Sequence, residues 1–328
     1  MKILVTGGAG FIGSVISAYF LDRGHEVRIL DDLSTGNEFA IDERAEFIRG
    51  SILNYSDLHK ALHQCEIVFH LAGKALVEES IHNPQIYMEV NREGTKKILE
   101  IMNVLGIYRI FFASTCSVYG NTYADSINEE TDLDPINPYA KSKLEADKLI
   151  ENYAKLDDFT GISFRFFNVS GAYFSKTQKW FGESHETETH LIPNLINWIE
   201  KGEFTIYGTD WDTADGTAIR DYVHVEDIAK AFYLAATNRM IYGNQIFNLG
   251  SELGYSIKQV IKTVEKVTNN KIKVVEGERR KGDPVKLVAN SSKFKKLSGW
   301  YPESDLEKTI DDSIKYFNYK TSSKFQGK

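Results

Sequence analysis

Short apolar runs of strand length alternate with longer amphipathic segments along the first half of the chain. Residues 15–21 and 84–105 have helical periodicity, and Asn91 lies part-way along the second segment. The apolar runs occupy residues 2–6, 26–30, 46–49, 67–70 and 108–113. Because strands that alternate with helices form parallel sheets, the pattern predicts an α/β fold with a Rossmann-like, doubly wound parallel sheet.

The rest of the chain is expected to divide between this sheet and a smaller α/β domain. Residues 222–237 and 245–249 are expected to return to the sheet as a helix and a strand. The first domain then comprises residues 1–168 and about 222–250, and the second comprises about 169–221 and 251–317. We expect the active site in the cleft between them and a flexible tail at 318–328.

Three glycines follow the first strand with the spacing GxxGxxG. Gly7 permits a tight turn, Gly10 lets a diphosphate approach the backbone, and Gly13 allows close packing of the next helix. The N-terminus of that helix would face the phosphates. A glycine pattern alone is weak, but the flanking strand and helix have the order that a dinucleotide site requires.

Asp31 and Asp32 end the second strand, about 20 residues after the glycines. A carboxylate at this point binds the ribose diol of adenosine and repels a 2′-phosphate. The sequence therefore favours NAD over NADP.

Tyr139 and Lys143 should lie four residues apart on one face of a helix that Asn137 caps and Pro138 begins. A unit charge roughly 5 Å away contributes about 3 kcal/mol at an effective dielectric of about 20, or more than two pKa units. This predicts a Tyr139 phenol that exchanges protons near neutral pH. The same spacing recurs at Tyr316 and Lys320, where an ordinary amphipathic helix explains it.

The strand at 108–113 leads to Thr115 at the carboxyl edge of the sheet. Its hydroxyl can bind a substrate hydroxyl, although a strand-end threonine can equally serve the local backbone. Cys116 is interpreted as a small buried residue, because no histidine lies nearby in the sequence to activate it.

The formal net charge of −7 and the lack of a basic run argue against a nucleic-acid partner. No window has the roughly 18 apolar residues of a membrane span, and the N-terminus does not resemble a signal peptide. Cys65 and Cys116 are typical of isolated thiols in a reducing compartment. We therefore expect a cytoplasmic protein without a membrane partner.

Together these motifs resemble the extended short-chain dehydrogenase/reductase family, which mostly acts on nucleotide-activated sugars. Several segments of the second half resemble the UDP-glucose 4-epimerases within it, and residues 212–225 are the most specific match. The others are residues 164–172, 182–185, 190–193, 206–210 and 279–284. The resemblance covers nearly all of residues 1–317.

The resemblance implies a hydride-shuttle epimerisation of UDP-glucose and UDP-galactose with bound NAD. Tyr139 as phenolate would remove the proton of the sugar 4-hydroxyl while C4 passes its hydride to the nicotinamide. The resulting 4-keto sugar would turn over and take the hydride back on its other face. Lys143 would hold the nicotinamide ribose, and Thr115 would position the hydroxyl.

Family positions also imply the remaining contacts. For NAD they are Gly7, Gly10, Phe11, Ile12, Gly13, Asp31, Asp32, Leu33, Ser34, Ser51, Ile52, Leu71, Ala72, Gly73, Asn91, Tyr139, Lys143 and Phe167. For the UDP-sugar they are Thr115, Asn168, His190, Leu191, Tyr207, Leu287, the phosphate-contacting Arg220 and Arg280, and Asp283 on the uridine ribose.

Two departures from the family pattern bear on ligand recognition. Ser51 stands where an aspartate near the adenine is usual, so recognition there must depend on the backbone or Ile52. Leu287 stands where some members have a tyrosine that closes the sugar pocket. A smaller side chain suggests that UDP-N-acetylglucosamine and its galactose epimer are also substrates.

The run from His185 to His190 contains two histidines and two glutamates. It lacks the helical spacing of a zinc protease, and the resemblance explains it as a substrate loop, so no metal is expected.

Three alternative functions are open. A 4,6-dehydratase would need an acid and a base beside the active threonine, where this chain has Cys116 and Ser117. A nucleotide-sugar reductase or decarboxylase would share Tyr139 and Lys143. A non-catalytic NAD-dependent regulator is the third. Family members commonly pair through two helices, here about 84–105 and 139–154, so we also expect a homodimer.

Overall fold

The computed structural model describes residues 1–122, 124–156, 158–185, 188–198, 202–280 and 283–322. The larger part of the fold is a seven-stranded sheet in the order β12-β6-β5-β4-β1-β2-β3, with every neighbouring pair parallel. The strands are β1 (Lys2–Thr6), β2 (Glu26–Asp31), β3 (Glu46–Arg49), β4 (Ile67–His70), β5 (Arg109–Thr115), β6 (Thr160–Phe166) and β12 (Asn244–Leu249). The predicted doubly wound sheet is confirmed. The strand order reverses at β1, where such sheets open a crevice at the carboxyl ends of their strands.

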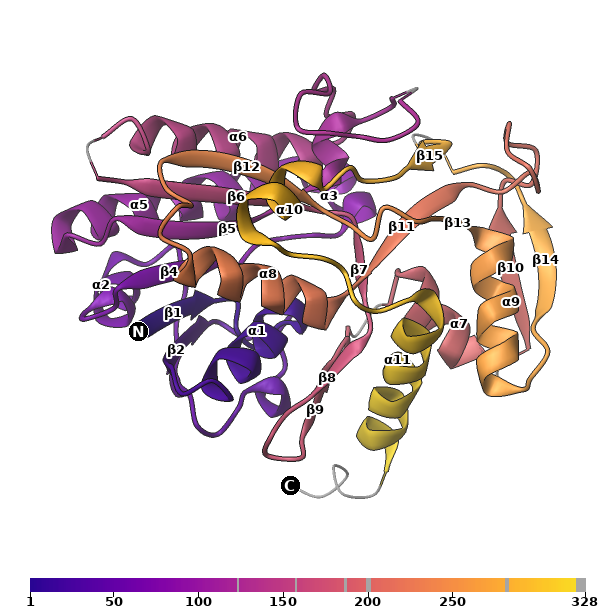
Figure 1. Ribbon diagram of the computed structural model, residues 1–328, viewed down its shortest axis with the longest axis horizontal. Helices are drawn as coiled ribbons and strands as arrows, with labels where there is room; N and C mark the ends of the chain where they lie inside the picture. Colours follow the sequence, from indigo (N-terminus) through magenta and orange to yellow (C-terminus); the bar gives the residue numbers. More distant parts are fainter. Residues whose placement is uncertain (123, 157, 186–187, 199–201, 281–282, 323–328) are drawn as a thin grey trace.

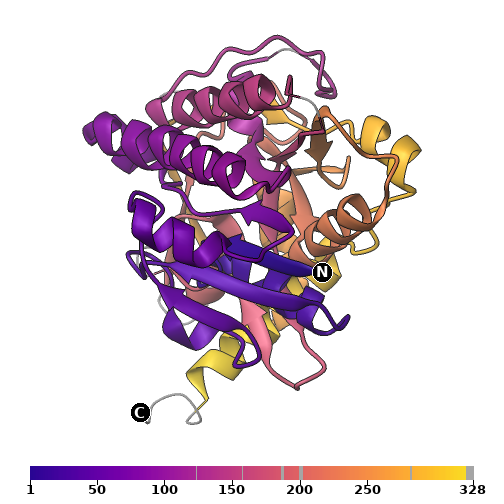
Figure 2. The ribbon, with the colours of Figure 1, turned by 90° about the vertical axis from the view of Figure 1, so that its left-hand side faces the viewer.

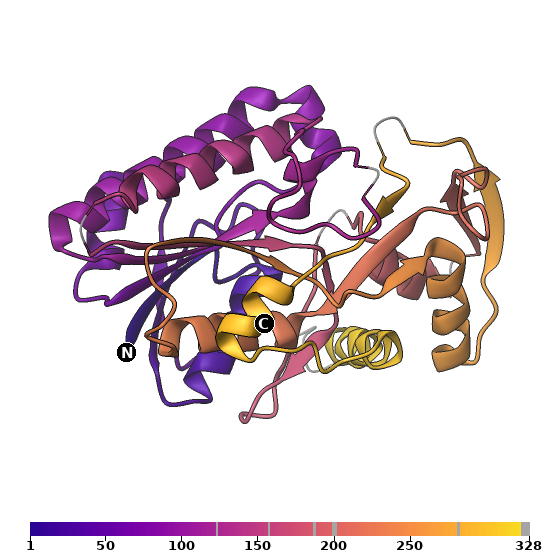
Figure 3. The same ribbon diagram turned by 45° about the horizontal axis from the view of Figure 1, so that its top comes forward.

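Helices cover both faces of this sheet (Figure 1, Figure 3). Ile3 and Val5 of β1 pack in one core cluster, whereas Leu4 between them packs in the other. This period of two is what a strand buried on both faces requires. The first cluster includes α1 (Phe11–Leu21) and α8 (Val225–Thr237), and the second includes α2 (Tyr55–Leu62), α5 (Gly94–Leu105) and α6 (Pro138–Tyr153).

The predicted helix at 84–105 is continuous but not uniform. It consists of α4 (Pro84–Tyr87), a π-helical segment η2 (Met88–Glu93) and α5. Asn91 lies in the wide π-helical turn, where its buried side chain bonds to the backbone of Lys74 and to the Ser142 hydroxyl. Such turns are frequent at functional sites, and periodicity could not reveal this one.

A smaller lobe lies at the other end of the molecule (Figure 1). In its main sheet β11 (Ile219–His224) pairs with β7 (Asn168–Ser170), β13 (Gly254–Ser256) and β15 (Lys286–Leu287). Two further pairs are β10 (Glu203–Tyr207) with β14 (Lys273–Gly277), and β8 (Ala172–Phe174) with β9 (Trp180–Gly182). The helices here are α7 (Leu191–Trp198), α9 (Ile257–Thr268) and α11 (Leu306–Thr321).

Four short helical segments complete the described part of the chain: η1 (Glu38–Ala40), α3 (Val77–His82), η3 (Cys116–Tyr119) and α10 (Ser292–Ser298). The expected flexible tail is wrong for residues 318–321, because α11 continues to Thr321, and residues 323–328 lie outside the described residues. None of the described helices is long and apolar enough to cross a membrane.

Candidate functional site

The glycine turn lies between the ends of β1 and β4. Gly7 has a positive φ of 71°, and a Cβ there would lie 2.5 Å from the Ala72 nitrogen. A Cβ on Gly13 would lie 2.2 Å from the Gly7 carbonyl oxygen, so both positions admit only glycine. Gly10 is the N-cap of α1, which has no side-chain cap and no acidic residue in its first turn. The donors at this helix end are therefore suited to the diphosphate of a dinucleotide.

Asp31 occupies the tip of β2 beside this turn. Its carboxylate accepts hydrogen bonds from the backbone nitrogens of Ala9 (3.0 Å) and Leu33 (2.9 Å). Burial raises the pKa of Asp31, and these two donors oppose the rise. Asp32 is exposed and accepts a hydrogen bond from the Ser34 nitrogen (2.9 Å). The two carboxylates are placed where a dinucleotide site of this fold binds the ribose diol.

The segment after β3 is organised by a residue that sequence reasoning missed. The Asp57 carboxylate accepts a hydrogen bond from the Ser51 nitrogen (3.0 Å), and the Ser51 hydroxyl accepts one from the Leu53 nitrogen (3.2 Å). Ile52 is buried and reaches toward Gly94. Asp57 thus fixes the loop that carries Ser51. This aspartate lies six residues after Ser51, the position where the resemblance leads one to expect an aspartate.

The loop after β4 lies against β1 and the helix η2. The backbone nitrogens of Leu71 and Ala72 bond to the carbonyl and hydroxyl oxygens of Thr6. A Cβ on Gly73 would lie 2.8 Å from Asn91 Oδ1 and 3.2 Å from Lys143 Nζ. The structure therefore brings Gly73, Asn91 and Lys143 together, as the NAD assignment requires.

Lys143 is almost completely buried on α6. Its Nζ donates to the Ala113 carbonyl at 2.9 Å and lies 4.7 Å from the centre of the Phe112 ring. Burial lowers the pKa of Lys143 to about 8, and the charge of Asp147 one turn further along the helix opposes the shift.

Asn137 caps α6 and Pro138 begins it, as predicted, so Tyr139 lies in the first turn. The predicted low pKa of its phenol is wrong for the protein itself. Burial raises the pKa of Tyr139 to about 12, against the opposing effect of its hydrogen bond with Thr115. The physical reason is that the Lys143 ammonium is directed at the Ala113 carbonyl, so desolvation dominates at the phenol.

Thr115 serves the local backbone, one of the two uses that the sequence left open, and also contacts Tyr139. Its hydroxyl accepts a hydrogen bond from the Ser117 nitrogen at 3.1 Å and also bonds to Tyr139. Cys116 is a buried free thiol, and burial raises its pKa to about 12. The prediction that Cys116 is a small buried residue and not a nucleophile is therefore confirmed.

A buried polar network beneath the site was also missed. The Asp147 carboxylate accepts a hydrogen bond from the Ser114 hydroxyl (2.9 Å) and pairs with Arg165 (3.4 Å). Arg165 donates to the hydroxyl of Tyr119 (3.0 Å), which donates to Asn248 (2.7 Å). The one available signal was Asp147 four residues after Lys143 on the same helix face.

His70 at the end of β4 is a second missed residue. It is fully buried, and its two ring nitrogens bond to the hydroxyls of Thr6 (2.8 Å) and Thr95 (2.9 Å). Burial, reinforced by the nearby Lys143 charge, lowers the pKa of His70 to about 3, so this ring is neutral at physiological pH.

Some of the residues predicted to bind the UDP-sugar lie near Thr115. Leu287 is buried in a cluster with Cys116 and Phe167, and Asn168 follows at the start of β7. Arg220 is the register partner of Leu287, and its charge acts to lower the pKa of Cys116. The structure therefore brings these residues to the end of β5.

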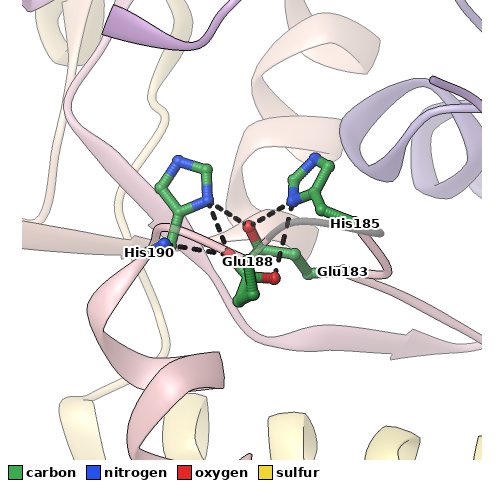
Figure 4. Close-up of side chains that lie close together, drawn as sticks. All are labelled: Glu183, His185, Glu188 and His190. Carbon is green, nitrogen blue, oxygen red and sulfur yellow. Dashed lines mark hydrogen bonds and ion pairs between the residues drawn. The ribbon is translucent and has the colours of Figure 1, made fainter. Parts of the chain in front are cut away.

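A second group forms farther along the small lobe. The Arg280 guanidinium carbon lies 4.2 Å from the centre of the exposed Tyr207 ring, and the Asp283 nitrogen bonds to the Arg280 carbonyl (3.3 Å). His190 and Leu191 lie where α7 begins, and the His190 ring contacts the carboxylates of Glu183 and Glu188 (Figure 4).

Comparisons with known proteins agree with this arrangement. Residues 3–250 match the model of the NAD dependent epimerase/dehydratase family. The UDP-glucose 4-epimerase of Corynebacterium glutamicum is 40% identical over 317 residues, which are 95% of this chain and 94% of that protein.

Two solved structures extend the likeness to the fold. UDP-glucose 4-epimerase from Bifidobacterium longum, in complex with NAD+ and UDP, is 30% identical with a TM-score of 0.90 over 98% of this chain and 99% of that one. The UDP-Glc/GlcNAc 4-epimerase from Campylobacter jejuni is 32% identical, with a TM-score of 0.83 over 97% of this chain and 99% of that one. With its glycine turn, Asp31 and buried Lys143 in place, the chain belongs to the NAD dependent epimerase/dehydratase family.

Proposed function

We propose that this protein interconverts UDP-glucose and UDP-galactose by inverting C4 of the sugar with bound NAD. The observation that carries the proposal is the placement of Tyr139 on α6. Its phenol bonds to Thr115, and Lys143 on the same helix lies close to Gly73. A hydrogen-bonded phenol at the nicotinamide end of a dinucleotide site suits removal of a hydroxyl proton from the carbon that loses hydride. The named relatives and the NAD-bound and UDP-bound neighbour support it.

Different residues of the site would bind different parts of NAD. With NAD bound, the N-terminus of α1 would face the diphosphate, Asp31 and Asp32 would bind the adenosine ribose, and the loop at Ser51 and Ile52 would contact the adenine. Lys143 and Asn91 would hold the nicotinamide end. NAD, when bound, would supply an acceptor that takes the hydride from C4 and returns it.

Thr115 and Tyr139 act on the 4-hydroxyl. Thr115 hydrogen-bonds the hydroxyl oxygen and keeps it beside the phenol. Tyr139 accepts the proton as C4 is oxidised to a 4-keto group and gives it back when the hydride returns to the opposite face.

Cations for the UDP diphosphate must be local, because the chain as a whole carries a formal net charge of −7. Arg220 and Arg280 supply planar guanidinium groups for phosphate oxygens. Asp283 follows on the Arg280 loop and suits the uridine ribose. Asn168, Phe167, His190, Leu191, Tyr207 and Leu287 complete the proposed contacts.

Dehydration is the alternative that the structure disfavours most. Cys116 is a buried thiol with a raised pKa, and Ser117 offers only a hydroxyl that accepts a hydrogen bond from Thr115, so these two residues supply no acid and base pair. A reductase, a decarboxylase or a silent regulator would keep the same NAD site, and each would leave UDP-galactose without conversion to UDP-glucose.

Two further assignments belong to the proposal. We place the protein in the cytoplasm, which the free, buried thiols of Cys65 and Cys116 support. We divide the chain into an NAD domain of residues 1–168 and about 222–250 and a UDP-sugar domain of the rest up to 317. Support comes from β12 closing one edge of the large sheet and α8 packing on α1.

A homodimer through the helices at about 84–105 and 139–154, which include α5 and α6, is the proposed assembly. The two helices lie side by side on the outer face of the sheet (Figure 2, Figure 3), and Val104 on α5 is 72% exposed. An exposed aliphatic side chain on one of two adjacent surface helices suits an isologous interface.

Replacing Tyr139 by Phe should lower kcat for UDP-galactose by about 10²- to 10⁴-fold, the usual share of general acid–base catalysis. Tyr153→Phe, on the same helix, is the matched control and should leave the rate unchanged. Anomeric proton NMR of the sugar nucleotides measures the conversion. A Tyr139→Phe enzyme with more than a tenth of wild-type kcat would contradict the role of the phenol.

The raised pKa predicts that Tyr139 remains protonated near neutral pH until a further positive charge arrives with the ligand. Phenolate absorbance of wild type minus Tyr139→Phe, measured without NAD, should show no signal up to about pH 10. Deprotonation should rise only above that range, and adding NAD should move the midpoint to lower pH. A midpoint near neutrality without NAD would mean that Lys143 alone acidifies the phenol.

We extend the substrate range to the N-acetylated pair, since Leu287 is smaller than tyrosine and lies next to the Thr115 region. Leu287→Tyr should keep UDP-galactose turnover and lower that of UDP-N-acetylgalactosamine by about 10- to 200-fold. Leu287→Met should retain both activities. No wild-type turnover of the acetamido sugar would refute this extension, and equal losses on both substrates would indicate disturbed packing instead.

Light scattering during size-exclusion chromatography should give twice the chain mass of 37.3 kDa. Val104→Lys should shift the protein toward monomer, because it places a charge in the proposed interface. Met240→Lys, at a position with the same 72% exposure outside these helices, should not. A wild-type mass of one chain would rule out the dimer.

A further inference from the structure

Two histidines and two glutamates converge in the segment between β9 and α7 (Figure 4). The donor atoms of Glu183, His185, Glu188 and His190 all lie within 4.8 Å of one another. His185 Nδ1 is 3.2 Å from Glu183 and 3.6 Å from Glu188, and His190 Nδ1 is 2.5 Å and 3.3 Å from the same two carboxylates. Four side chains from one short segment thus point at a common centre.

Glu183 provides a separate indication of a ligand. Its side chain is only 5% exposed, and neither carboxylate oxygen accepts a hydrogen bond of normal geometry among the described residues. A buried carboxylate is costly unless it is hydrogen-bonded, paired with an opposite charge or bound to a metal ion, and the groups that face Glu183 are the imidazoles of His185 and His190. Side chains that bind one shared cation point at the cation and not at each other. Such an arrangement would explain why the Nδ1 atoms of His185 and His190 lie close to the Glu183 carboxylate without the alignment of a hydrogen bond.

The spacing of the four donors fits tetrahedral coordination. Zinc binds imidazole nitrogen and carboxylate oxygen at about 2.0 to 2.2 Å, which places the ligand atoms of a tetrahedron about 3.3 to 3.6 Å apart. The contacts of 3.2, 3.3 and 3.6 Å are close to this spacing, although the two that involve Glu188 reach its two different oxygens. The 2.5 Å contact between His190 and Glu183 would have to open for the four donors, which lie within 4.8 Å of one another, to surround one ion.

We propose that Glu183, His185, Glu188 and His190 bind one divalent transition-metal ion, of which zinc is the expected example. Two carboxylates balance the charge of a divalent ion, and two imidazoles favour zinc over magnesium or calcium, which prefer oxygen ligands alone. Four protein ligands close the coordination sphere, as in structural zinc sites.

Neighbouring groups hold one ligand in place. Oxygen Oε1 of Glu188 accepts hydrogen bonds from the backbone nitrogens of Thr189 and His190, both at 2.9 Å. The Asn194 side chain on α7 donates to the Glu188 carbonyl at 3.2 Å. Such supporting bonds fix the orientation of metal-bound carboxylates.

The ion would fasten the end of β9 to the start of α7. It would therefore fix the segment that carries the proposed substrate contacts His190 and Leu191. Binding through Nδ1 leaves the Nε2 edge of His190 directed away from the cluster (Figure 4), so both assignments of this residue are compatible. The expectation of no metal rested on the missing helical spacing of zinc proteases and on the resemblance to a substrate loop, whereas the four proposed ligands lie outside the described helices and strands.

Zinc titration of the full-length, chelator-treated protein tests the proposal. Calorimetry should give one zinc per chain, and zinc should raise the unfolding temperature by several degrees. Glu183→Gln and His185→Asn should each weaken zinc binding by at least about tenfold, whereas His63→Asn, at an exposed histidine outside the cluster, should not. Affinities equal in wild type and both variants would overturn the site.

Cobalt provides a measurement that needs only the wild-type protein and so decides the matter even if a variant fails to fold. Co²⁺ in this site should show the intense visible bands of tetrahedral coordination, and zinc should displace it. Magnesium should neither displace cobalt nor change the unfolding temperature. A weak octahedral spectrum, or no stoichiometric binding, would refute the proposal.

Discussion

The hydrogen bond from the buried ammonium of Lys143 to the Ala113 carbonyl is the interaction on which the rest of the site depends. A charge in the protein interior costs several kcal/mol unless dipoles or opposite charges surround it, and here the Ala113 carbonyl, the Phe112 ring and the distant carboxylate of Asp147 do so. Because the carbonyl belongs to β5, the contact fixes α6 against the end of that strand. The position of Tyr139, one helical turn earlier, follows.

This anchoring also sets the electrostatics of the reaction. Lys143 uses its hydrogen bond on the Ala113 backbone, so burial governs Tyr139 and raises the pKa of the phenol. A further positive charge must accompany the ligand if the phenol is to act as a base near neutral pH, and the oxidised nicotinamide ring carries one. Under the proposed function, the basicity of Tyr139 would therefore be coupled to occupation of the dinucleotide site. Without that coupling, a permanently ionised phenolate would have to be maintained in a buried site.

The parts that sequence predicted well are those with local causes. The glycine turn follows from Gly7 and Gly13, whose added Cβ atoms would clash, and the start of α6 follows from the Asn137 cap. The parts that were missed depend on contacts across the fold. The π-helical turn at Asn91 and the reversed pKa shift of Tyr139 both arise from partners distant in sequence or from burial, which periodicity does not report. From the sequence, the run from His185 to His190 is interpreted as a substrate loop, and Glu183, which lies outside that run, is not linked to it.

Isotope tracing tests the hydride shuttle most directly, because in such a shuttle one hydride leaves C4 and returns to it while only the hydroxyl proton passes through Tyr139. UDP-galactose carrying deuterium at C4 should yield UDP-glucose that retains the deuterium at C4, with none exchanged into water. Loss of the label to solvent, or no UDP-glucose at all, would contradict the hydride shuttle and the function built on it.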